Sequence, residues 1–240
     1  MADIEAVVFD WGGTLTHPIE VIYDIDTWSK AARHLDKDRA DELIERLGAV
    51  EAQLWELSRT SQKSAHLFRL VASAVEELGL DVAESILEEA VLLHLDELSP
   101  HIVHDSDAAP VLRDLRATGL KVGLLSNTLW PTSFHEAFLD RDGLSDLIDC
   151  RMYTSDMDVT KPHPEAFLQT LAALGVDDPA RAVFVGDRPW DDIFGAKRAG
   201  MRAVHRPNRL VPDFEVTADA TIDSLPALLE VIVAWRAESD

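Results

Sequence analysis

Three short apolar runs, each ending in polar residues, constrain the fold of this chain more than any other feature. They read VVFD (7–10), KVGLLSN (121–127) and RAVFVGD (181–187). A short apolar run bounded by turn residues is typical of a strand that is buried on both faces of a parallel sheet. Around the second and third runs, strand patterns alternate with helical ones. This alternation predicts a parallel sheet covered by helices on both faces.

The same alternation places the smaller elements. We expect shorter strands at 147–150, 202–205 and 220–222, and helices at 109–116, 164–174, 192–199 and 225–236. The predicted fold class is therefore α/β, with a doubly wound parallel-sheet core.

Helical periodicity dominates the region between the first and second strands. Apolar residues recur three or four positions apart along it, at Leu43, Leu47, Val50, Leu54 and Leu57. They form one face of a single helix, or of two helices that meet near Gly48. Further helical patterns end at Gly79 and Pro100. We therefore expect two domains: a core of residues 1–16 and 106–240, and a smaller α-helical domain of residues 17–105 inserted after the first strand.

Charge and composition exclude several classes of partner. The net charge of −22 argues against nucleic acid and against anionic membrane surfaces. The acidic N-terminus lacks the pattern of a signal peptide, and the stretch 228–235 is too short to span a bilayer. A single cysteine, Cys150, excludes an internal disulfide framework. We expect a cytoplasmic protein with no membrane or nucleic-acid partner, and the oligomeric state stays open.

Polar groups at strand ends identify the candidate site. Asp10, the pair Ser126–Asn127 and Asp187 each end a predicted strand, and the carboxyl ends of parallel strands meet at one edge of the sheet. Lys161, in TKPHPEAF (160–167), comes just before a predicted helix. A carboxylate nucleophile, a hydroxyl, a cation and further acids together suit phosphoryl transfer assisted by Mg²⁺.

Four ordered motifs resemble those of the haloacid dehalogenase (HAD) superfamily of hydrolases. They are FDWGGTL (9–15), LLSNT (124–128), TKPHPEAF (160–167) and VFVGDRPWDDIFGAKRAGM (183–201). The order and the length of chain covered match members with a helical cap inserted after the first motif. The resemblance implies a Rossmann-like core, a cap formed by 17–105, and a small phosphorylated substrate.

The resemblance also implies roles for the residues around the nucleophile. Asp10 would attack the substrate and form an aspartyl intermediate. Ser126 would hydrogen-bond the transferring group, with Asn127 and the backbone of Gly13 and Thr14 nearby. Lys161 would hold the nucleophile and the phosphate together electrostatically.

A magnesium site follows from the same resemblance. Mg²⁺ would be held by Asp10, the backbone carbonyl of Gly12 and Asp187. Asp191 and Asp192 compete for the remaining acidic position, and the motif does not decide between them.

Gly12 departs from the phosphatase pattern. Phosphatases of the superfamily usually carry a second aspartate at this position, which protonates the leaving group and activates water. Glycine retains the carbonyl for the metal but cannot act as an acid or base, a contribution typically worth about 10²–10⁴-fold in rate. A phosphatase would then use another group, and His17 is a candidate from its position only.

Three alternatives therefore remain beside a phosphatase. Phosphonoacetaldehyde hydrolases also have Trp after the nucleophile and a small residue next, and they use a cap lysine; the lysines of this cap are Lys30, Lys37 and Lys63. A protein that binds a phosphate ligand with weakened turnover is the second alternative. A haloacid dehalogenase is the third, although Asp187 would then be an unneeded carboxylate beside the nucleophile.

Overall fold

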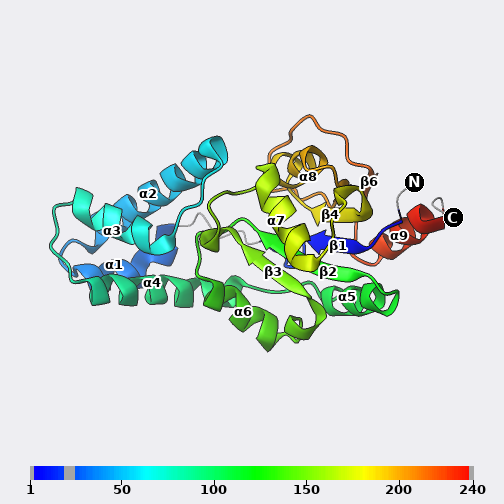
Figure 1. Ribbon diagram of the computed structural model, residues 1–240. Helices are drawn as coiled ribbons and strands as arrows, with labels where there is room; N and C mark the ends of the chain where they lie inside the picture. The colour runs from blue at the N-terminus through cyan, green and yellow to red at the C-terminus, as the bar shows by residue number, and fades with distance from the viewer. Residues whose placement is uncertain (1–2, 19–24, 238–240) are drawn as a thin grey trace.

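The computed structural model describes residues 3–18 and 25–237, and within these ranges it contains a six-stranded parallel sheet (Figure 1). The spatial order is β3-β2-β1-β4-β5-β6. The strands are β1 (Ala6–Phe9), β2 (Lys121–Ser126), β3 (Cys150–Tyr153), β4 (Ala182–Gly186), β5 (Arg202–His205) and β6 (Ala220–Thr221). The order reverses at β1, so the carboxyl end of β1 lies at the switch point where α/β sheets place their sites. The predicted α/β fold class is confirmed.

Alternation along β1 separates two hydrophobic cores. Val7 and Phe9 belong to one cluster of buried residues, whereas Ala6 and Val8 belong to another. Successive side chains of a strand point to opposite faces of the sheet, so a continuous apolar run contributes to both cores. All four residues are buried. This central strand therefore holds the residue that follows it, Asp10, in a fixed position.

Helices cover both faces of the sheet (Figure 1). On one face lie α5 (Ala108–Ala117), α6 (Thr132–Arg141) and α9 (Ala227–Ala237), which contribute to the first core. On the other lie α7 (Pro164–Leu174) and the short α8 (Gly195–Arg198), which contribute to the second. This arrangement is the doubly wound core predicted from the alternation of strands and helices.

A group of helices lies between β1 and α5 in sequence and to one side of the sheet in space (Figure 1). It comprises a 3-10 turn (Ile25–Trp28), α1 (Ser29–Leu35), α2 (Ala40–Ser61), α3 (Leu67–Glu77) and α4 (Glu84–Leu98). The two segments that join it to the sheet run antiparallel, through a bridge between Thr16 and His104. The predicted cap, 17–105, includes residues 19–24, and the predicted core includes 1–2 and 238–240; these lie outside the described residues.

Some predicted element boundaries are wrong. The strand expected at 147–150 is instead Cys150–Tyr153, because residues 145–147 form a 3-10 turn. The helix expected at 192–199 begins earlier, as a π-helical turn over Pro189–Phe194 that continues into α8. The apolar pattern around Gly48, for which one helix or two were expected, belongs to one continuous helix, α2, so the single-helix alternative is confirmed. Local periodicity does not reveal such turns, because they are short and closed by hydrogen bonds between residues three or five positions apart, which the apolar pattern does not distinguish from those of an α-helix.

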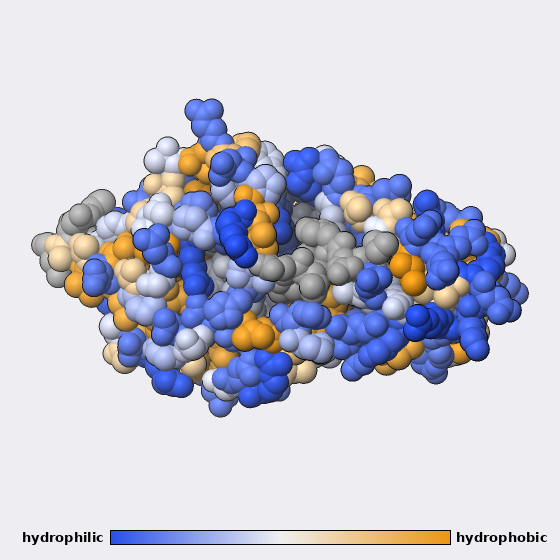
Figure 2. All heavy atoms as spheres, turned by 180° about the vertical axis from the view of Figure 1, so that it is seen from behind, coloured by the Kyte–Doolittle hydropathy of each residue, from blue (hydrophilic) through white to orange (hydrophobic). Residues whose placement is uncertain are grey.

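The visible surface is largely hydrophilic (Figure 2). Figure 2 shows hydrophilic residues over most of one side, both around the inserted helices and around the sheet. Within the described ranges, no helix has the length and apolar character needed to cross a membrane.

Candidate active site

A buried lysine lies between two aspartates at the carboxyl edge of the sheet. Lys161 Nζ donates to Asp10 Oδ1 at 2.6 Å and to Asp192 Oδ1 at 2.7 Å. The side chains of Lys161 and Asp192 are 1% and 0% exposed. Buried charges of this kind persist only when they are paired, so these three residues form one electrostatic unit.

Hydrogen bonds to the backbone hold two of these three residues, Asp10 and Lys161, in place. The Asp10 amide donates to the Val185 carbonyl at 2.9 Å, which extends the pairing of β1 with β4 by one residue. Asn127, directly after β2, binds the backbone of Lys161 twice: Asn127 Nδ2 donates to its carbonyl at 3.0 Å, and its amide donates to Asn127 Oδ1 at 2.9 Å. Asn127 therefore positions the loop that carries Lys161 and precedes α7; we call this loop the lysine loop.

Asp187 completes a group of three carboxylates. Among the described residues, Asp10, Asp187 and Asp192 each offer one ligand oxygen, and these oxygens lie within 4.8 Å of one another. Asn208 Nδ2 donates to Asp187 Oδ2 at 2.7 Å. Asp187 Oδ1 is buried and has no hydrogen-bond partner among the described residues. An orphaned buried carboxylate oxygen is costly unless a cation or ligand faces it.

The electrostatics of this group suit the binding of a cation. Burial raises the pKa of Asp187 to about 8 and that of Asp10 to about 6, and Lys161 partly offsets the rise at Asp10. Burial lowers the pKa of Lys161, but the charges of Asp10 and Asp192 outweigh it, so the net shift is upward. When ionised, the three carboxylates and the one ammonium sum to a charge of −2. That balance and an all-oxygen donor set suit a hard divalent cation.

Asp191 is not part of the three-carboxylate group. Its Oδ2 faces Arg188 NH1 at 3.6 Å, and burial raises its pKa to about 6. The π-helical turn directs the neighbouring Asp192 to Lys161 instead. Trp190, in the same turn, stacks on Phe194 with ring centroids 4.6 Å apart.

The other predicted substrate-binding groups lie close by, but two of the amides are already engaged. The Gly13 amide donates to Thr16 Oγ1 at 3.1 Å, and the Thr14 amide donates to the Trp11 carbonyl at 3.3 Å. Ser126 is buried at the end of β2. The predicted amides of Gly13 and Thr14 are thus engaged within their own turn, and Ser126 ends the strand next to β1 in the sheet.

His17 lies on the segment that leads into the inserted helices. Its amide donates to the Val103 carbonyl at 2.9 Å, and the residue is exposed. His17 is therefore exposed to solvent, whereas the three carboxylates of the site are buried.

The inserted helices contact the two loops that carry site residues. Lys63, between α2 and α3, forms an antiparallel bridge with Val159, and the Thr160 amide donates to the Gln62 carbonyl at 3.1 Å. The Leu67 amide donates to the Leu129 carbonyl at 2.8 Å. We call residues 62–67 the docking segment. It places the backbone of Lys63 beside the lysine loop, and the Lys63 residue is exposed, as is Lys37, whereas Lys30 pairs with Asp96.

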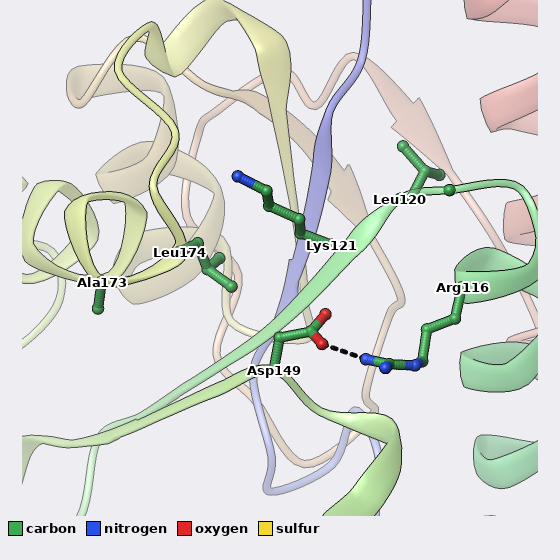
Figure 3. Close-up of a pocket in the computed structure, with 7 residues that line it drawn as sticks. Arg116, Leu120, Lys121, Asp149, Ala173 and Leu174 are labelled. Atoms are coloured by element: carbon green, nitrogen blue, oxygen red, sulfur yellow. Dashed lines mark hydrogen bonds and ion pairs between the residues drawn. The ribbon is translucent and has the colours of Figure 1, made fainter.

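A cavity of about 390 Å³ lies elsewhere (Figure 3). Its lining includes Lys121, the first residue of β2, and Asp149, which precedes β3, so it occupies the amino edge of the sheet. Asp149 pairs with Arg116 in this cavity. The carboxylates lie at the opposite edge, and the cavity is not their site.

Comparison with known proteins agrees with the motifs. A family model described as a haloacid dehalogenase-like hydrolase matches residues 4–200. Glyceraldehyde 3-phosphate phosphatase of Methanopyrus kandleri is 27% identical over 82% of this chain and 91% of its own length. Phosphonoacetaldehyde hydrolase of Bordetella pertussis is 26% identical over 84% of this chain and 71% of its own length. The crystal structure of 2-haloacid dehalogenase from Pseudomonas syringae pv. Tomato superposes with a TM-score of 0.72 and 29% identity, covering 97% of this chain and 99% of that one.

Proposed function

Because this chain belongs to the haloacid dehalogenase-like hydrolases, we propose that it is a metal-dependent phosphatase of a small phosphorylated metabolite. Asp10 is the nucleophile and carries the phosphoryl group as an aspartyl intermediate. Similarity to glyceraldehyde 3-phosphate phosphatase over most of both chains supports the reaction class.

The single observation that carries the proposal is the unpartnered oxygen of Asp187. Asp187 brings a third carboxylate to Asp10 and Asp192, and Lys161 compensates only one of the three charges. Displacement of a halide from carbon would need no such carboxylate beside the nucleophile. A cation-assisted attack on phosphorus does need it, and this difference favours the phosphatase over the dehalogenase.

The residues present fit a magnesium ion. Asp10, Asp187 and Asp192 supply carboxylate oxygens, and the backbone carbonyl of Gly12 is the further donor that we assign. When bound, Mg²⁺ neutralises the charge that develops on the transferring phosphoryl group. Asp191, which faces Arg188, is outside this set.

The chain's own residues account for the two steps. An Asp10 oxygen attacks phosphorus, the bond from phosphorus to the alcohol oxygen breaks, and that oxygen takes a proton from solvent. A water oxygen then attacks the same phosphorus, loses a proton to solvent, and the bond to Asp10 breaks to restore the carboxylate. Lys161 balances the charge of Asp10 throughout, and Ser126 donates to a phosphoryl oxygen.

Release of phosphate from a panel of phosphate esters, with and without Mg²⁺, tests this proposal. We expect Mg²⁺-dependent hydrolysis that Asp10→Asn abolishes. Release of halide from 2-haloacids in the absence of Mg²⁺, without any phosphatase activity, would overturn it.

Phosphonoacetaldehyde hydrolysis is a second candidate, favoured by the Trp11–Gly12 pair and by the similarity to the Bordetella enzyme. In this reaction a lysine amine condenses with the substrate aldehyde, releasing water, before the C–P bond breaks. Lys63 is the candidate, because its bridge to Val159 places it beside the loop of Lys161. Borohydride together with phosphonoacetaldehyde would then reduce the imine and leave the substrate carbons covalently attached to the wild type but not to Lys63→Arg, which mass spectrometry measures.

A further inference from the structure

Asn208 contacts the site from a segment that no motif covers. It lies three residues after β5, and its Nδ2 donates to Asp187 Oδ2 at 2.7 Å. Its Oδ1 accepts from the Leu210 amide at 3.0 Å. Because a backbone amide only donates, this contact fixes the orientation of the Asn208 side chain and turns its NH₂ group to Asp187.

The segment that carries Asn208 is anchored on both sides of the site. The Arg206 amide donates to the Gly186 carbonyl at 2.9 Å, directly before Asp187. The Arg206 side chain binds the Thr14 carbonyl and the carboxylate of Asp105. These contacts hold Asn208 at a fixed distance from Asp187.

Gly13 leaves the space in which this contact forms. Its φ is +83°, and a Cβ atom there would lie 2.3 Å from Asp187 Oδ2 and 2.8 Å from Asn208 Nδ2. The Asp187 carboxylate is therefore confined between a glycine and an amide donor. One oxygen is engaged, and the other, Oδ1, is left without a partner among the described residues.

We propose that Asn208 is a positioning residue for the cation site. By engaging Oδ2, it holds the Asp187 carboxylate in the one orientation that leaves Oδ1 for the cation. Groups that orient a metal ligand typically contribute about 10–100-fold to metal affinity. The inference rests on the magnesium site of the proposed function, and it adds a residue from outside the four motifs.

Titration calorimetry with Mg²⁺ alone, on the metal-stripped 240-residue chain, tests the proposal. We expect Asn208→Ala to weaken Mg²⁺ binding by about 10–100-fold. Asn208→Leu, which keeps the approximate volume without the donor, should do the same. Leu210→Ala is the matched control, because that exposed side chain is in the same segment and only its backbone contacts Asn208.

A second measurement distinguishes a role of Asn208 in orienting Asp187 from a general loss of structure in the active site. In the Asn208 variants, the Mg²⁺ concentration for half-maximal activity should rise, while kcat at saturating Mg²⁺ stays near that of the wild type. A folded Asn208 variant that binds Mg²⁺ within twofold of the wild type would overturn the inference alone. A wild type that binds Mg²⁺ but hydrolyses no phosphate ester would overturn the proposed function alone. A wild type that binds no Mg²⁺ would overturn both.

Discussion

Gly12 has open space around it in the turn after β1. An added Cβ atom would meet no heavy atom within 4 Å, and the backbone of Gly12, unlike that of Gly13, is outside the positive-φ region that favours glycine. Neither sterics nor backbone strain therefore requires glycine at this position. The consequence of Gly12 is chemical: the turn lacks an acid that it has room to hold.

We predict that Gly12→Asp folds with an unchanged melting temperature and accelerates hydrolysis of esters with poor leaving groups. The gain in rate should approach about 10²–10⁴-fold. It should be much smaller for activated aryl esters, because their leaving groups depart without needing a proton. Steady-state rates on both ester types measure it. Gly12→Asn, of similar size but without an acid, should show no gain. If the Gly12→Asp variant folds but hydrolyses no ester faster than the wild type, the absence of an acid at position 12 does not limit the rate, and the prediction is wrong.

Lys161 forms buried ion pairs with both Asp10 and Asp192. We predict that Lys161→Met lowers the free energy of unfolding by about 3–5 kcal/mol at pH 8, because it leaves buried carboxylates unpaired. Urea denaturation in EDTA measures the loss, which should shrink at pH 5, where carboxyls with raised pKa values take up protons. Lys197→Met, which removes a half-exposed ion pair with Asp219, is the control and should cost under about 1 kcal/mol. Equal losses for both variants would contradict the prediction.

At the scale of the element, α2 carries a carboxyl inside the inserted helices. Glu51 is 4% exposed, and its Oε2 accepts from Trp28 Nε1 at 2.9 Å. Trp28 stacks on His94 with ring centroids 3.6 Å apart. Burial raises the pKa of Glu51 to about 7 and lowers that of His94 to about 4. The ionised form of Glu51 therefore disfavours the folded state.

We predict that Glu51→Gln stabilises the protein at pH 8 and has little effect at pH 4.5. Between the unfolded pKa near 4.5 and the folded value near 7, the folded state binds the extra proton, so stability falls as pH rises through that window. Glutamine keeps an acceptor for Trp28 and removes the charge, a gain of roughly 3 kcal/mol. Thermal unfolding at both pH values measures it. The exposed Glu45→Gln serves as the control, and a gain that is equal at both pH values would count against this assignment.

Strand ends were the most informative elements in the sequence, because a polar residue after a buried apolar run marks the sheet edge whatever its tertiary context. That logic placed Asp10 and Asp187 at one edge. It could not choose between Asp191 and Asp192, since the choice depends on a π-helical turn that local periodicity does not reveal. Asn208 was missed because it follows β5 in an irregular segment. Polar residues after this strand were nevertheless a signal available in the sequence.

At the scale of the whole molecule, the docking segment connects the inserted helices to both site loops. Its backbone bonds reach Thr160 and Leu129, whereas the two segments that join the inserted helices to the sheet meet at the antiparallel bridge between Thr16 and His104. A cap that opens about that bridge must break the docking bonds while keeping the bridge. We infer that ligand binding favours the docked arrangement, which excludes water from the carboxylates.

Hydrogen exchange tests this motion. With a saturating phosphate mimic, we predict slower exchange at the amides of Ser64, Leu67 and Thr160, which donate across the contact. Exchange near His17 and Ser106 should also change, because the joining segments absorb the rotation. Amides of β4, in the middle of the sheet, provide the internal control. Identical exchange with and without the mimic at all of these positions would argue for a static cap.

The central place of β1 in the sheet has a consequence for synthesis of the chain. β1 is made first, yet its neighbour β4 begins only at Ala182. At about 5–20 residues per second, the nascent chain carries a fully apolar strand with one unpaired edge for on the order of ten seconds. Such an edge is a template for aggregation, so fragments that end before β4 should require chaperones to stay dispersed. Activity can appear only after β4 closes that edge, because Asp192 comes later still.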